Sequence, residues 1–173
     1  MNKQINIAIK EKAVCLLEKY RCKNYDSTDI EILNVHLKEI NSICDKKIFD
    51  KNSLFVRSST LWELMQPEGS KGKHNFHGLS PEEIFNALKG TLNPYCIYNT
   101  KENRIAVATM FLNNRKEKLL VIIELHAGLE NDRFANINKL VSIYPKKNLD
   151  SLIQKLDEKD ILYIKKENRT GLQ

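Results

Sequence analysis

The alternation of apolar and polar positions divides the chain into a helical N-terminal part and a β-rich C-terminal part. Residues 4–22 carry apolar side chains at helical spacing. Residues 28–44 do so again, and Thr28 with Glu31 forms a capping-box pattern at their start. The polar residues 23–27 predict a turn between these helices. Residues 1–50 are therefore expected to form a helical hairpin that extends a main domain of residues 51–173.

The middle of the chain predicts a short strand, two helices and a loop. Residues 53–57 are typical of a strand, and residues 60–66 of a short helix. Residues 67–78 contain glycines and basic side chains that indicate a loop. Ser80, Pro81 and Glu83 then supply an N-cap, a first-turn proline and a capping-box acid. This helix is expected to end at Gly90.

Beyond residue 93 the pattern is that of short strands joined by polar turns. Strands are expected at residues 95–99, 104–112, 118–126, 137–144 and 161–166, with a short helix from Asn148 to about residue 156. The predicted fold class is α+β. It has N-terminal helices and a twisted, mainly antiparallel sheet of about five strands, with helices on one face. The opposite face is then free to hold a site.

Composition narrows the class of protein. Hydrophobic residues make up 42% and charged residues 29%, which favours a packed core over disorder. No apolar run of about 18 residues is present, and residues 1–12 lack the apolar block of a signal peptide. The expected location is cytoplasmic, or a target cell into which a phage or secretion system delivers the protein. The four cysteines form no CxxC pair and share no standard spacing with the histidines, so no metal and no cofactor is expected.

The positive charge is concentrated in the C-terminal part. The net charge is +6, and residues 51–173 hold nineteen basic and fourteen acidic side chains. Such an excess favours anionic partners such as nucleic acid, although surface lysines also serve simply to solvate a protein.

Five segments resemble, in order, the nuclease domains of the barnase, EndoU, colicin and RelE-like superfamily found in phages and polymorphic toxins. They are KHNFHGLS at 73–80, LNPYCIY at 92–98, LVIIEL at 120–125, LVSIY at 140–144 and LYIKK at 162–166. The chain is most similar to the version at the C-terminus of Mu F-type phage head proteins. Pro145 stands where the family usually has glycine, and the loop at 69–73 looks short. The resemblance implies a metal-independent endoribonuclease that forms 2′,3′-cyclic phosphates, with RNA as partner and an immunity or host target protein as a further one.

Metal-free RNA cleavage requires a base, an acid and groups that bind the scissile phosphate. Histidine suits proton transfer because its ordinary pKa is near neutrality. His77 lies three residues before the capped helix and matches the family's histidine, and His74 is the alternate. Ser142 and Tyr144 are two residues apart on one strand and so share a face. Lys166 is the predicted phosphate-binding cation.

Two further residues complete the predicted site. Lys73 and His126 are expected, with His74, to bind substrate. Alternation along the strand predicts that Glu124 and His126 share a face, where the carboxylate could tune the imidazole.

Two other function classes fit the same features. A phage or mobile-element protein could use a non-catalytic version of this fold to bind and inhibit a host protein, with the N-terminal helices as the interface. A non-catalytic RNA-binding module is the second alternative. A protein that binds a host factor should tolerate changes at His77 and Tyr144 and respond instead to surface changes on the helices.

Overall fold

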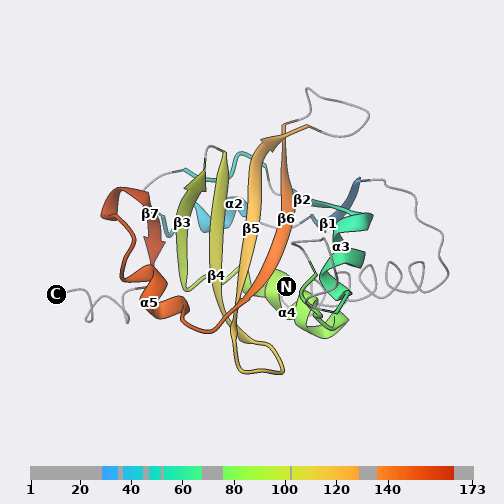
Figure 1. The fold of residues 1–173 in the computed structure, drawn as a ribbon. Coiled ribbons are helices and arrows are strands. Elements are labelled where there is room, and N and C mark those ends of the chain that lie inside the picture. Colours follow the sequence, from blue (N-terminus) through green and yellow to red (C-terminus); the bar gives the residue numbers. More distant parts are fainter. Residues whose placement is uncertain are drawn as a thin grey trace.

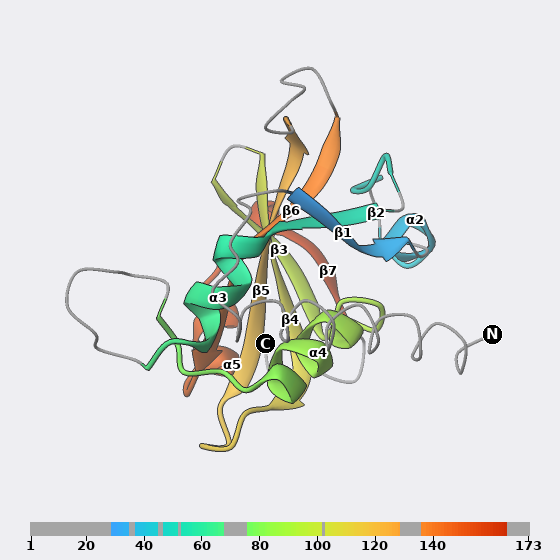
Figure 2. The same ribbon diagram turned by 90° about the vertical axis from the view of Figure 1, so that its right-hand side faces the viewer.

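The computed structural model of the chain describes residues 29–34, 37–44, 47–51, 53–67, 76–101, 103–128 and 136–165. These residues form a seven-stranded sheet with helices against both faces (Figures 1 and 2). The strands are β1 (Asp29–Asn34), β2 (Ser53–Arg57), β3 (Cys96–Lys101), β4 (Arg104–Leu112), β5 (Lys118–Ala127), β6 (Ile137–Lys146) and β7 (Ile161–Ile164). The helices are α2 (Leu37–Ile40), α3 (Ser58–Met65), α4 (Pro81–Gly90), α5 (Leu149–Ile153) and the 3-10 helix η1 (Glu158–Asp160). Among these residues, no helix is both long enough and apolar enough to cross a membrane.

The sheet has the strand order β1-β2-β6-β5-β4-β3-β7. Every neighbouring pair is antiparallel except β2 and β6, which run parallel. The predicted α+β class and mainly antiparallel sheet are confirmed. All five strands expected beyond residue 93 are present. The sheet is wider than expected because β1 and β2 join it beside β6.

The helix predicted over residues 28–44 is wrong. Residues 29–34 form β1, which pairs with β2, and only the short helix α2 follows. Ile30 and Ile32 alternate with polar residues and are β-branched, so the segment also carried a strand pattern. Pairing with β2 stabilises the strand rather than the helix. The other helix of the predicted hairpin, residues 4–22, lies outside the described residues.

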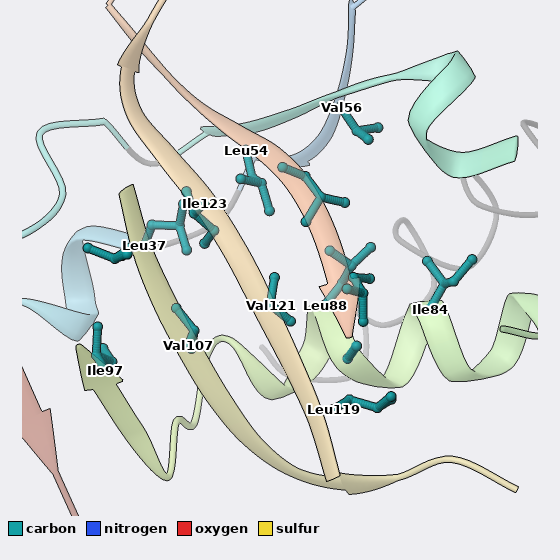
Figure 3. Packing of buried hydrophobic residues seen from close by; sticks show 14 of the residues in the cluster. Leu37, Leu54, Val56, Ile84, Leu88, Ile97, Val107, Leu119, Val121 and Ile123 are labelled. Atoms are coloured by element: carbon teal, nitrogen blue, oxygen red, sulfur yellow. The ribbon is translucent and has the colours of Figure 1, made fainter. Parts of the chain in front are cut away.

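The main core lies between the sheet and helices α2, α3 and α4 (Figure 3). Odd-numbered residues of β5 such as Val121 and Ile123 point into this core and are fully buried. From the helix side, Ile84 and Leu88 of α4 meet the sheet (Figure 3). The even-numbered Leu120 of β5 faces the other way, into a second cluster. Burial on both faces explains why β5 reads as a continuous apolar run.

The other face of the sheet is covered in part by α5. Leu149 and Ile153, one helical turn apart, are buried there against Cys96 and Leu120. Lys118 Nζ donates to both carboxylate oxygens of Asp150, at 2.7 and 2.9 Å, and so ties α5 to β5. Helices therefore lie on both faces, rather than on one face only as expected. Figure 1 looks onto this second face, with α5 at its lower left.

The predicted capping box of α4 is confirmed. Ser80 Oγ accepts a hydrogen bond from the Glu83 backbone N–H, and Glu83 Oε2 accepts one from the Ser80 N–H at 2.6 Å. The other oxygen of Glu83 accepts from the Asn114 N–H, which joins α4 to the β4–β5 turn. Burial alone would raise the pKa of Glu83, but the backbone hydrogen bonds from Ser80 and Asn114 hold it below its ordinary value.

Gly90 lies at the predicted end of α4, but it does not form the left-handed cap that glycine often supplies there. It is the last helical residue, and the next residue, Thr91, keeps a right-handed conformation. A Cβ atom at Gly90 would lie 2.7 Å from Cβ of Thr109 and 3.0 Å from Cδ2 of Phe111. The glycine therefore permits the close approach of α4 to β4, rather than a left-handed cap.

Replacing Gly90 with alanine is expected to destabilise the protein by about 1–3 kcal/mol, because the added methyl overpacks the contact between α4 and β4. Urea denaturation followed by circular dichroism measures this loss. The matched control is Lys89→Ala, an exposed change one residue earlier, which should alter the free energy of unfolding by no more than about 0.5 kcal/mol. Equal stabilities for the two variants would contradict the packing role.

Candidate functional site

The C-terminal half of β6 carries the first elements of the site. Within the described residues, β2 pairs with β6 only at residues 138–140, so residues 142–146 have a strand partner, β5, on one side only. Ser142 pairs with Ile122 of β5, and Tyr144 pairs with Leu120. Both side chains therefore lie on the face of the sheet that α5 covers in part.

His77 reaches β6 from the segment between α3 and α4. The Gly78 N–H donates to the Gln66 carbonyl at 2.7 Å, and the Leu79 N–H donates to the Leu64 carbonyl at 2.9 Å. Gly78 has a φ of 62°, a left-handed conformation that favours glycine. Phe76 packs edge-on against Trp62 of α3, with ring centroids 5.8 Å apart. Contacts on both sides of His77 thus fix the backbone that carries it.

The structure brings His77, Ser142 and Tyr144 together. Nε2 of His77 lies 3.4 Å from Oγ of Ser142, at the long end of hydrogen-bonding distance. The rings of His77 and Tyr144 meet edge-on, with centroids 4.8 Å apart and planes inclined at 64°. Ser142 is fully buried, whereas His77 and Tyr144 are half-buried. The two rings therefore remain partly open to solvent, and the serine hydroxyl lies beneath them.

A shallow hollow of about 230 Å³ adjoins this group. It is lined by Tyr98, Thr100, Leu120, Ile122, Tyr144, Lys146 and Leu152. Ala106 and Ala108 of β4 lie between β3 and β5 on this face, paired with Tyr98 and Cys96 on one side. Both alanines are fully buried beneath this face of the sheet.

Lys146 is the site residue that the sequence analysis missed. It lies two residues beyond Tyr144 on β6, so Ser142, Tyr144 and Lys146 follow one face of the strand. The strand was predicted to end at Tyr144, but β6 continues through Pro145 to Lys146. A proline is tolerated here because β6 has no second strand partner at this point in the described structure. Continued alternation through Pro145 was the signal that could have found Lys146.

The structure does not support Lys166 as a neighbour of Tyr144. Lys166 itself lies outside the described residues, as do Lys73 and His74. The strand that leads to Lys166, β7, lies at the far edge of the sheet beside β3. Four strand spacings, about 19 Å, separate β7 from β6. The prediction that Lys166 closes a strand next to Ser142 and Tyr144 is wrong, because β5, β4 and β3 intervene.

His126 lies apart from the other candidates. Its Nδ1 is 2.8 Å from Oδ1 of Asn136 and 3.9 Å from a carboxylate oxygen of Asp50. His126 has a φ of 57°, which interrupts the alternation that predicted a shared face with Glu124. Glu124 instead accepts hydrogen bonds from Arg104 at 2.9 and 3.2 Å. The predicted Glu124–His126 pair is therefore wrong.

Burial raises the pKa of two side chains on this face of the sheet, Tyr98 and Cys96. It raises the pKa of each to about 12. The Tyr98 hydroxyl thus stays protonated at neutral pH, and the Cys96 thiol is a poor nucleophile. Among the described residues, no three His, Cys, Asp or Glu side chains are grouped as metal ligands.

Comparison with known proteins gives one match. No curated protein and no solved structure matches the chain significantly. A family model described as the phage MuF-C-terminal domain matches residues 68–170, which include α4 and strands β3 to β7. The match spans more than half of the 173 residues, so the chain belongs to the phage MuF-C-terminal domain family.

Proposed function

We propose that this phage-related domain is an endoribonuclease that cleaves RNA without a metal ion. The observation that carries the proposal is the meeting of His77, Ser142 and Tyr144 beside a hollow that contains Lys146. An imidazole, a phenol and an ammonium group supply the proton transfer and the phosphate binding that this reaction requires.

His77 acts as the base in the proposed reaction. It takes the proton of a ribose 2′-hydroxyl as that oxygen attacks the adjacent phosphorus. The new P–O2′ bond forms while the P–O5′ bond breaks, which gives a 2′,3′-cyclic phosphate and a 5′-hydroxyl end. An imidazole suits this step because it exchanges protons near neutral pH.

Tyr144 and Lys146 act on the phosphate. The Tyr144 hydroxyl donates to the phosphate and supplies the proton of the leaving 5′-oxygen. Afterwards Tyr144 regains a proton from solvent and His77 releases to solvent the proton that it took from the 2′-hydroxyl. The Lys146 ammonium group offsets the negative charge that grows on the non-bridging oxygens. Ser142 is buried and touches His77, so it is a positioning residue that holds the imidazole rather than a nucleophile.

Incubation of the purified chain with single-stranded RNA in excess EDTA tests the proposal. We expect cleavage products that end in 2′,3′-cyclic phosphate, detected by mass spectrometry. The matched control is a DNA oligonucleotide of the same sequence, which should stay intact because it lacks the 2′-hydroxyl. Activity that returns only on addition of one divalent ion, or equal cleavage of the DNA, would show that the mechanism is wrong.

A further inference from the structure

A second hollow, of about 390 Å³, continues from the first along α5. It is lined by Lys146, Lys147, Asn148, Ser151, Leu152 and Lys155. Lys146 and Leu152 line both hollows, so the two are contiguous. The turn after β6 and the exposed side of α5 thus extend the surface that begins at Tyr144.

The charge of this second hollow is uniformly positive. Three of its six lining residues are lysines and none is a carboxylate. Within the described structure, Lys146, Lys147 and Lys155 make no ion pair. The nearby Asp150 is bound by Lys118, whose hydrogen bond lowers the Asp150 pKa. The three ammonium groups are therefore available to a ligand.

The polar side chains of the hollow suit phosphate oxygens. Ser151 supplies a hydroxyl donor and Asn148 an amide donor between the lysines. Nucleic-acid backbones are held largely by lysines and such neutral donors, without reading the bases. This second hollow lies beside Tyr144 and Lys146. RNA that extends from the proposed cleavage site would therefore pass over it.

We propose that Lys147 and Lys155, with Ser151, bind the phosphodiester backbone of single-stranded RNA that extends from the His77 site. The inference rests on the proposed ribonuclease function for its choice of ligand. It adds a track along α5 that holds several phosphates beyond the scissile one.

Binding of a fluorescein-labelled 2′-O-methyl RNA tests the track, because this RNA cannot be cleaved. In fluorescence anisotropy, Lys147→Ala/Lys155→Ala should raise Kd about 10-fold at low salt. The slope of log Kd against log salt should fall by about 1.4, the share of two phosphates on a single strand. The matched control is Lys51→Ala/Lys89→Ala, which removes two exposed lysines from other parts of the surface and should leave Kd within about twofold.

The outcomes separate the two proposals. Equal losses in both double variants, or no loss in Lys147→Ala/Lys155→Ala, would overturn the track, as would failure of the unsubstituted chain to bind the RNA. A specific loss of binding without any RNA cleavage by the unsubstituted chain would keep the track and reject the ribonuclease. RNA cleavage by the unsubstituted chain, together with normal RNA binding by Lys147→Ala/Lys155→Ala, would keep the ribonuclease and reject the track.

Discussion

Replacing His77 with alanine is expected to lower the rate of RNA cleavage by about 100-fold or more, the usual contribution of a general base. The imidazole is the group placed to accept the 2′-hydroxyl proton, and Ser142 and Tyr144 define its position. The half-buried ring contributes little to the core, so the melting temperature should change little. Initial rates on a short RNA and a thermal melt measure the two effects.

The matched control for this prediction is His126→Ala. His126 is an exposed histidine that binds Asn136 at the other end of β5. Its loss should leave the rate within about twofold, since it lies about 13 Å along β5 from the partner of Ser142. Equal rates for His77→Ala and His126→Ala would remove His77 from the mechanism and leave the binding alternatives.

The sequence predicted the strands beyond residue 93 because each carries a strong local signal. Apolar runs mark β4 and β5, and short polar turns separate them. The capping box likewise placed the start of α4 correctly. These features depend on neighbours within a few residues, which is why pattern alone identified them.

What the sequence could not give was the order of the strands. The prediction for Lys166 failed because β7 pairs with β3 rather than β6. The helix predicted over residues 28–44 failed because β1 is paired with β2, and only the tertiary context decides between two competing periodicities. Residues gathered within one strand, such as Ser142 and Tyr144, were predictable; those contributed by distant strands were not.

His77 is the instructive exception, since it is 65 residues from Ser142 in the sequence. The resemblance to a known family, rather than periodicity, linked the histidine to the β6 segment. The structure then supplied the physical reason for their meeting. Gly78 and Leu79 tie the segment to the end of α3, and this helix lies against β2 and β6.

Replacing Tyr144 with phenylalanine is expected to lower kcat by about 100-fold, comparable to the loss of one preorganised donor in other active sites. Phenylalanine keeps the ring that meets His77 edge-on and that packs beside Leu152, so only the hydroxyl is removed. The hydroxyl is proposed to bind the phosphate most tightly as charge develops on it. The change should therefore appear in kcat, with KM altered by less than about threefold.

The matched control is Tyr163→Phe, which removes a tyrosine hydroxyl from β7 at the opposite edge of the sheet. Its kcat should equal that of the unsubstituted chain. A rise in KM alone for Tyr144→Phe would make the hydroxyl a ground-state binding group rather than a donor in the transition state. An unchanged kcat and KM would place the phosphate elsewhere in the hollow, with Lys146 and Tyr98 as the polar side chains left to hold it, because both line the hollow.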